Sequence, residues 1–263
     1  MSHLNTNISA RQHEGILADV ADGVLTVTLD REDKRNAITY DMYLAIVHLL
    51  EQARSDRRVR CILFRAQGSI FTAGHDVSGF AKGVDMAFDQ KPSYKFMQSL
   101  STCPKPVVAM LNGDAVGIGA TMLLHCDLVY AVPGARLVFP FTKMGLVPEF
   151  GSTYHLPLRI GHQKAMELFL RQGLCSTKEA AAWGIVNEVV PRQRIHAVVA
   201  DALADIVALS PEAVTQTKAL AKAAFSSANE IAIATEAQVF HELLRSDFVR
   251  HRIASIQRSI SRS

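Results

Sequence analysis

The residues best suited to chemistry in this sequence are a glycine-rich run and a lone carboxylate beyond it. The run, residues 112–127, reads NGDAVGIGATMLLHCD, and the carboxylate is Glu149. A glycine-rich turn that leads into a helix directs backbone N–H groups toward one point, where they stabilise negative charge as it develops. A carboxylate among apolar neighbours has a raised pKa and is suited to taking up and returning a proton. The two features together predict proton transfer through an anionic intermediate.

Glu149 also has a purely structural interpretation. A helix is expected to start near Gly151, and an acidic residue is favoured in the first turn of a helix. In that case Glu149 would cap the helix at the surface. Its neighbours Val147, Pro148 and Phe150 would instead exclude water from the carboxylate, which favours the role of proton carrier.

The composition is that of a globular chain, with 263 residues of which 49% are hydrophobic and 20% charged. The net charge of +3 is too small to indicate nucleic-acid binding but suits an anionic small molecule. The four cysteines lack CxxC spacing, which predicts reduced thiols and a cytoplasmic location. No apolar run has membrane-spanning length, and neither the polar start nor the Ser-Arg-Ser end resembles a secretory or peroxisomal address.

The elements that must position these residues alternate between strands and helices. Residues 15–20 and 24–29 flank an Asp-Gly pair and predict a hairpin. Apolar residues recur at helical spacing over 39–54, and residues 59–64, 107–111 and 128–132 are short apolar runs typical of buried strands. A helix is expected over 119–125. This order predicts mostly parallel strands covered by helices, an α/β fold.

From about Ser176 onward the chain is expected to be helical. Ser176 and Glu179 have the spacing of a capping box, and helical patterns continue over 195–209, 211–224 and 230–244. We therefore predict a core over residues 1–200 and a C-terminal helical region over 201–263. The helices are expected to pack on the core or on a neighbouring subunit rather than to fold alone.

Several segments resemble the crotonase superfamily, also called the enoyl-CoA hydratase/isomerase family. They are residues 29–37 (LDREDKRNA), 71–77 (FTAGHDV), 112–127 and 139–156, followed by 180–191 (AAAWGIVNEVVP). Motifs in one order and register are far more specific than any one alone. The resemblance implies a spiral of ββα units, a homotrimer or dimer of trimers through the C-terminal region, and a coenzyme A thioester substrate. It implies no metal and no separate cofactor, because coenzyme A is part of the substrate.

The resemblance also implies an oxyanion hole. The thioester oxygen would accept from the backbone N–H groups of His75 and Ile118, and an enolate needs such donors because its charge develops in a dry site. At His75 the family more often has a small residue, and only the N–H of His75 is expected to act. The residues expected to contact the substrate are Lys34, Arg35, Ala37, Ala73, His75, Asp76, Val77 and Ile118. Asp76 is interpreted as mainly shaping its loop, and Lys34 and Arg35 either meet a phosphate or form a solvated basic turn.

The carboxylates distinguish the activities within this family. Hydratases of the family use two glutamates, because adding water needs a base for the water and an acid for the carbon. In register, those positions hold Thr121 and Phe141. Glu149 falls where single-carboxylate enoyl-CoA isomerases carry their glutamate and where ring-opening isomerases of aromatic degradation carry an aspartate. The resemblance thus implies an enoyl-CoA isomerase that moves a 3-ene to a 2-ene, as in fatty acid β-oxidation, with Glu149 as its proton carrier.

Other interpretations stay open at this level. Within the family they are an enoyl-CoA hydratase (a lyase) and a ring-opening acyl-CoA isomerase, and in a different class a non-catalytic acyl-CoA-binding protein. Tyr154 and His155 either face the pocket or belong to the core, and residues 84–96 are expected to shape the acyl pocket. His125 and Cys126 lack further ligands at suitable spacing for a metal. The sequence GDAVGIG lacks the order of a dinucleotide motif or a P-loop, and FGST has no GxSxG elbow.

Overall fold

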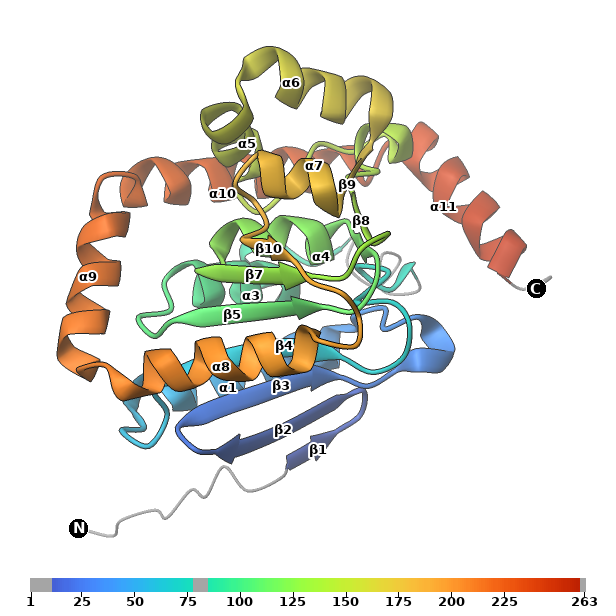
Figure 1. Cartoon of the computed structure of the whole chain (residues 1–263). Coiled ribbons are helices and arrows are strands. Elements are labelled where there is room, and N and C mark those ends of the chain that lie inside the picture. Colours follow the sequence, from blue (N-terminus) through green and yellow to red (C-terminus); the bar gives the residue numbers. More distant parts are fainter. Residues whose placement is uncertain (1–10, 78–84, 261–263) are drawn as a thin grey trace, which may run out of the picture.

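The computed structural model describes residues 11–77 and 85–260 and shows a layered α/β fold (Figure 1). The strands are β1 (Arg11–His13), β2 (Ile16–Ala21), β3 (Val24–Leu29), β4 (Cys61–Ala66), β5 (Val107–Leu111), β6 (Ala115–Val116), β7 (Leu128–Ala131), β8 (Arg136–Val138), β9 (Leu174–Ser176) and β10 (Glu188–Val189). The helices are α1 (Tyr40–Ser55), α3 (Pro92–Ser101), α4 (Ile118–Thr121), α5 (Ser152–Ile160), α6 (His162–Glu167), α7 (Thr177–Ala182), α8 (Ile195–Ala208), α9 (Pro211–Ala223), α10 (Ser226–Leu243) and α11 (Asp247–Ile260). Short turns complete the order: η1 (Glu32–Lys34), η2 (Phe88–Gln90), η3 (Met122–His125), η4 (Thr142–Met144) and a π-helical turn, η5 (Leu168–Gln172).

The main sheet has the order β1-β2-β3-β4-β5-β7-β10. The β1, β2 and β3 strands pair antiparallel, whereas β3, β4, β5, β7 and β10 run parallel. A second sheet, β6-β8-β9, stands beside it. Parallel strands need crossover connections, and the intervening helices supply them. The loops that follow β4 and β5 therefore leave the sheet at the same edge.

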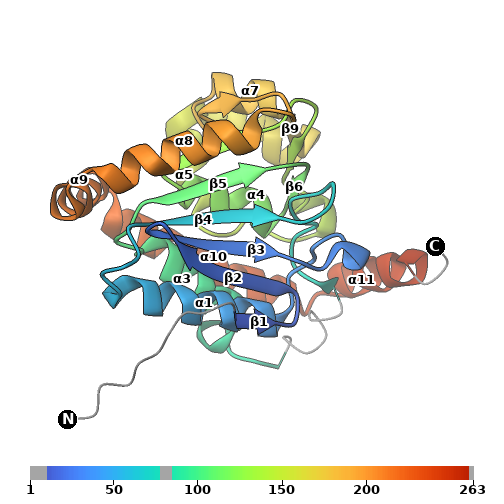
Figure 2. The same ribbon diagram turned by 60° about the horizontal axis from the view of Figure 1, so that its bottom comes forward.

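Helices cover both faces of the main sheet (Figure 2). On one face, Ile195, Val199 and Leu203 of α8 pack on strand residues that include Leu63 and Met110. On the opposite face, α1 and α3 lie under the larger core cluster, with apolar side chains that recur along α1 at helical spacing. Strands that are covered on both faces are apolar along their whole length, as β5 is.

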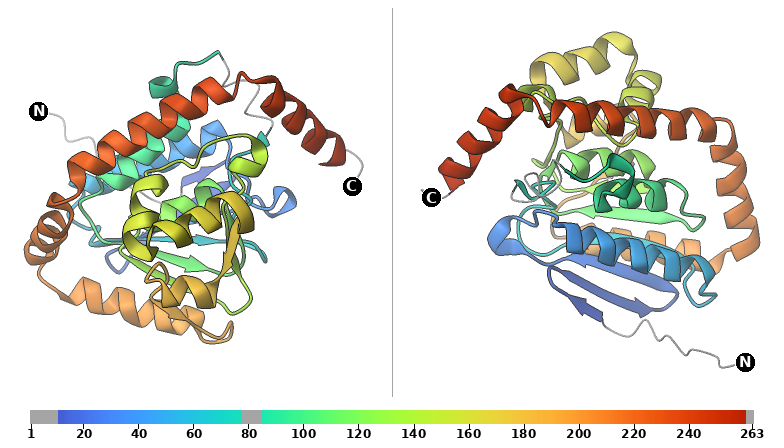
Figure 3. Two further views of the ribbon diagram at one scale, coloured as in Figure 1. Left: turned by 90° about the horizontal axis from the view of Figure 1, so that it is seen from above. Right: turned by 180° about the vertical axis from the view of Figure 1, so that it is seen from behind.

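The last four helices form an arch around the core. Helix α9 stands at one side of the molecule, α10 crosses behind the sheet, and α11 projects away from the body (Figure 3). Helix α9 is attached by Lys218, whose Nζ lies 2.6 Å from Asp127 Oδ2 and 2.7 Å from the Lys105 carbonyl oxygen. Val249 of α11 packs in a small apolar cluster with Leu146 and Leu244. Through these contacts α10 is held across the segment that carries Glu149.

Most predicted elements are confirmed, including the first hairpin, α1, the buried strands β4, β5 and β7, and the capping box at α7. The predicted helix over 119–125 is α4 followed by the tighter turn η3. Sequence analysis missed α3, α6 and the short strands β1, β6, β8 and β9, whereas α11 lies within the helical region predicted over 201–263. The proposed division at residue 200 stays a prediction, and α8 runs across it. Within the described residues no helix is long and apolar enough to cross a membrane.

Candidate active site

Two loops lie side by side at the edge of the sheet where β4 and β5 end. Thr72 and Ala115 form a parallel bridge, and the Val116 N–H donates to the Thr72 carbonyl oxygen at 3.0 Å. Ile118 is the first residue of α4, so its N–H has no acceptor within that helix. His75 pairs with Ile38, and that bridge uses the N–H groups of Ile38 and Asp76. The sequence-predicted pair, His75 and Ile118, is thus carried by two directly bonded loops.

Glycines allow these loops to approach. Gly74 has a φ of +87°, and a Cβ there would lie 2.6 Å from the Val116 carbonyl oxygen. At Gly119, a Cβ would lie 2.1 Å from Thr72 Cγ2. A side chain at either position would push the two loops apart, which is why this arrangement needs glycine.

A cavity of about 230 Å³ opens beside the two loops and is the candidate substrate pocket. Of the residues predicted to act in the site, Ala73, His75, Val77, Ile118 and Glu149 line it. Further lining comes from α1, η2, α3, the η4 segment and α10, contributed by Tyr40, Phe88, Lys91, Ser93, Tyr94, Met97, Pro140, Phe141, Met144, Leu146, Ala237, Phe240 and Leu244. Among these described lining residues Glu149 is the only carboxylate. Residues 78–84 lie outside the described part of the chain, so the predicted acyl-pocket segment 84–96 is seen from residue 85 onward.

Glu149 is half-buried in the cavity wall, and its reduced contact with water is the main cause that raises the pKa of this carboxyl to about 8. The negative charge of Glu236 also raises that pKa, while the Lys91 ammonium lowers it. Glu149 forms no ion pair with any described residue. A carboxyl with a pKa this close to neutrality exchanges a proton in either direction at little cost, as a carrier between two carbon atoms must.

Glu236 of α10 occupies the helix cap that Glu149 was considered for. Glu236 Oε2 accepts from the Gly151 N–H at 2.6 Å, and Oε1 accepts from the Thr153 N–H at 2.8 Å and from the Thr153 hydroxyl. These N–H groups belong to the start of α5, where an anion is favoured. Because Glu236 accepts from the N–H groups at the start of α5, Glu149 is not needed as a cap, and it lines the cavity instead. Sequence reasoning missed Glu236, since it is one polar residue on a helix with nothing nearby to mark it.

Lys91 is a second cavity residue that the sequence did not reveal. It is only 7% exposed, and its Nζ lies 3.0 Å from His241 Nδ1. Burial and, to a smaller extent, the charge of Arg245 lower the pKa of Lys91 to about 8, whereas the charge of Glu149 acts in the opposite direction. The pocket therefore contains the carboxyl group of Glu149 and the amine of Lys91, whose charged forms attract each other.

The imidazole of His75 packs between two tyrosine rings. It is stacked on Tyr43 with ring centroids 5.6 Å apart, and the Tyr40 ring centroid lies 5.3 Å away. His75 Nδ1 is 3.3 Å from the Tyr43 hydroxyl. Burial lowers the pKa of His75 to about 4, so the ring is neutral at physiological pH. A neutral, packed ring is consistent with the expectation that only the N–H of His75 acts.

The other predicted contact residues lie outside the cavity lining. Asp76 forms an ion pair with Arg31, whose Nη1 is 2.5 Å from Asp76 Oδ2 and also donates to the Ala37 carbonyl oxygen. Lys34 and Arg35 are exposed in and after η1, and the Arg35 carbonyl oxygen accepts from the Ala73 N–H at 2.9 Å. The Arg35 backbone thus borders the loop that lines the cavity, and contact of the Lys34 and Arg35 side chains with a phosphate stays a prediction.

Thr121 and Phe141 occupy the two positions discussed for water addition. Thr121 is fully buried, and its hydroxyl lies 3.4 Å from the carbonyl oxygens of Gly117 and Ile118. Phe141 lines the cavity and is 5% exposed. Neither side chain can transfer a proton to carbon, so the described cavity lacks the second acid of a two-carboxylate mechanism.

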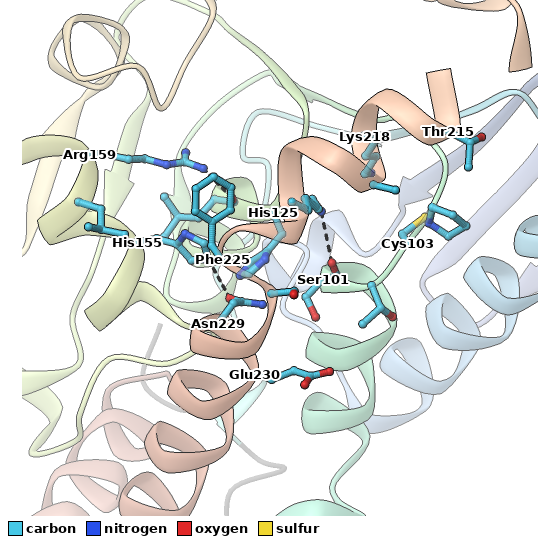
Figure 4. Close-up of a pocket in the computed structure, with 17 residues that line it drawn as sticks. Ser101, Cys103, His125, His155, Arg159, Thr215, Lys218, Phe225, Asn229 and Glu230 are labelled. Carbon is cyan, nitrogen blue, oxygen red and sulfur yellow. Dashed lines mark hydrogen bonds between the residues drawn. The ribbon is translucent and has the colours of Figure 1, made fainter. Parts of the chain in front are cut away.

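A second cavity, of about 500 Å³, lies between α9 and the core and is lined by residues of α5, α9 and α10. Figure 4 shows His155 and Asn229 joined there by a hydrogen bond, with His125 close by. His125 Nε2 lies 2.7 Å from the Phe150 carbonyl oxygen, and the two rings stack. His155, whose place was left open, thus lines this second cavity, and it packs behind the Glu149 segment through His125. In the described part of the chain, no cluster of three or more His, Cys, Asp or Glu residues could hold a metal ion.

The fold and the paired loops define the crotonase class of acyl-CoA enzymes. A family model described as enoyl-CoA hydratase/isomerase matches residues 19–258, and the chain belongs to that family. It is 34% identical over 216 residues to enoyl-CoA delta isomerase 3, peroxisomal, of Mus musculus, covering 80% of this chain and 68% of the relative. It is 35% identical over 183 residues to 1,2-epoxyphenylacetyl-CoA isomerase of Escherichia coli (strain K12), covering 67% and 70%. The solved structure of Pseudomonas aeruginosa OdaA superimposes with a TM-score of 0.89 at 39% identity, covering 93% of this chain and 99% of that chain.

Proposed function

We propose that this protein is an enoyl-CoA isomerase that converts a 3-enoyl-CoA thioester into the 2-enoyl-CoA thioester. The observation that carries the proposal is the single carboxylate, Glu149, in a described cavity whose walls also include His75 and Ile118. One carboxyl group is sufficient for isomerisation, because the proton removed is later returned. The similarity to enoyl-CoA delta isomerase 3 supports this assignment.

In the proposed reaction the Glu149 carboxylate removes a proton from C2 of the substrate. The electron pair of the C–H bond moves toward the thioester carbonyl, whose oxygen becomes negative and accepts from the N–H groups of His75 and Ile118. In related reactions each such donor stabilises the transition state by about 3 kcal/mol. The protonated Glu149 then gives its proton to C4, the double bond settles between C2 and C3, and the carbonyl reforms. No water, metal or separate cofactor takes part in this scheme.

Two neighbouring activities are the alternatives. A ring-opening acyl-CoA isomerase is favoured by the similarity to 1,2-epoxyphenylacetyl-CoA isomerase. Hydration is disfavoured by Thr121 and Phe141, because no second carboxyl group in the described lining serves the water. A homotrimer or dimer of trimers and a cytoplasmic location remain predictions, and the size of the particle in solution tests the first.

The test is turnover of 3-hexenoyl-CoA and 2-hexenoyl-CoA by the purified protein, its Glu149→Gln variant and a Glu230→Gln control. Glu230 is an exposed glutamate of α10, so its substitution makes the same Glu→Gln exchange away from the substrate pocket. We expect a shift of the 3-ene to the 2-ene that falls at least about 100-fold in Glu149→Gln and not in Glu230→Gln. Hydration of 2-hexenoyl-CoA that survives in Glu149→Gln would contradict the proposal. Tight binding of acyl-CoA without turnover would indicate a binding protein.

A further inference from the structure

The segment that carries Glu149 has an unusual backbone. Phe150 follows it with a φ of +64°, a left-handed conformation that costs a residue with a side chain about 1–2 kcal/mol. Its ring is fully buried and packs against Phe96 and His125. Such a conformation persists only where the surroundings hold it, so the contacts of this segment determine where the carboxylate of Glu149 points.

Three contacts act on the carbonyl oxygens of Glu149 and Phe150 and on the Gly151 N–H. The Ser152 N–H donates to the Glu149 carbonyl oxygen at 3.2 Å, and His125 lies against the Phe150 carbonyl oxygen. The third contact is the Gly151 N–H, which donates to Glu236 Oε2 at 2.6 Å. Gly151 itself is left-handed, with a φ of +69°. Only the third contact comes from the C-terminal helices, and it is the only one of the three that carries a charge.

Glu236 is 6% exposed and forms no ion pair with a described residue, so its charge is balanced by the three donors from Gly151 and Thr153 alone. Two charged groups act on the pKa of Glu149, Glu236 on α10 and Lys91 just before α3, and the charge of Glu149 in turn raises the pKa of Tyr43 on α1. Burial raises the pKa of Glu236 to about 7, while the hydrogen bonds from Thr153 and Gly151 favour its ionised form. Its negative charge therefore favours the protonated form of Glu149.

We propose that Glu236 is a positioning residue for the isomerisation, holding the Glu149 segment by hydrogen bonds from α10 and placing a negative charge behind the proton carrier. This inference rests on the proposed function. It assigns a specific task to α10, which crosses the cavity and whose Ala237 and Phe240 line it directly. The C-terminal region then completes the catalytic apparatus and does more than cover it.

The test compares Glu236→Gln with Glu236→Asp and with Glu230→Gln on the same helix, using the pH dependence of kcat/KM for 3-hexenoyl-CoA. Glutamine removes the charge and cannot accept from both N–H groups through two oxygens. Aspartate keeps the charge but is shorter by one methylene group. In the wild-type protein kcat/KM should rise toward about pH 8, where Glu149 loses its proton.

In Glu236→Gln we expect the rise of kcat/KM to move to lower pH and kcat to fall about 10- to 100-fold, as misplacement of a catalytic group by about 1 Å does. In Glu236→Asp we expect a lower kcat with the rise at its wild-type pH, and in Glu230→Gln no change. A fall of kcat in Glu236→Gln with an unmoved pH dependence would reduce Glu236 to a structural role and overturn the inference. If Glu236→Gln does not fold, a Glu236→Asp variant with wild-type kcat overturns it equally. A wild-type protein without isomerase turnover would remove the proposed function and this inference together, whereas wild-type turnover with an unaffected Glu236→Gln variant contradicts only the inference.

Discussion

Substituting Glu149 by Gln should make the protein more stable at alkaline pH. Burial and the charge of Glu236 raise the pKa of Glu149 from its ordinary value of 4.5 to about 8. Between these two pH values the folded protein holds a proton that the unfolded chain has released, so the free energy of unfolding falls as pH rises. Each tenfold change in proton affinity is worth about 1.36 kcal/mol, which sets an upper limit of about 5 kcal/mol for the whole interval. A neutral glutamine escapes this loss.

The assay is urea-induced unfolding of the wild-type protein and Glu149→Gln at pH 5 and at pH 8.5, at one protein concentration because an oligomer's stability depends on it. The two proteins should unfold alike at pH 5, and the variant should be more stable by up to about 5 kcal/mol at pH 8.5. Glu230→Gln, an exposed site, should follow the wild type. A difference between Glu149→Gln and wild type that is the same at both pH values would refute the argument that the half-buried Glu149 is protonated in the folded state.

Three further outcomes are expected. Gly74→Ala should lower kcat/KM and stability, whereas Gly134→Ala, with a φ of +82° but no atom within 4 Å of the new Cβ, should cost only about 1–2 kcal/mol of stability in a urea titration. His75→Phe should keep kcat within about tenfold and leave the pH dependence of kcat/KM unmoved, because burial holds the pKa of His75 near 4; a loss comparable to that of Glu149→Gln would contradict this. Lys218→Met should cost about 1.5–3 kcal/mol of unfolding free energy, as loss of hydrogen bonds to a charged group does, because the buried Lys218 ammonium donates to Asp127 and to the Lys105 carbonyl oxygen; an unchanged unfolding midpoint would show that these contacts do not secure α9.

Local patterns of the sequence account for much of the fold. The hairpin, the buried strands and the amphipathic α1 follow from periodicity and turn residues, which act between neighbours in the chain. The missed strand β6 has only two residues, too few to show a period. Helix α3 was missed because it lies in a stretch interpreted only as acyl pocket and because no capping side chain marks its start. Its apolar residues pack against α1, which only the tertiary structure shows.

Some residues of the candidate site could be predicted from local motifs, and others could not. Glu149, His75 and Ile118 stand in motifs whose order and spacing are visible in the chain, and the structure brings all three to one cavity. Lys91 and Glu236 were not predicted. They come from segments remote in sequence, and a charged residue on a helix reads as solvated until a partner is seen.

The sequence by itself determined the α/β class, the family, and the presence of one carboxylate where two would be needed for hydration, because these depend on residue identity and spacing. Only the tertiary structure decided how that carboxylate behaves. Its pKa depends on burial and on the charges of Glu236 and Lys91, and its direction depends on a left-handed Phe150 held by His125 and by a helix more than eighty residues further along. Burial and Coulomb interactions act through space, and no local pattern records which distant side chains they will join.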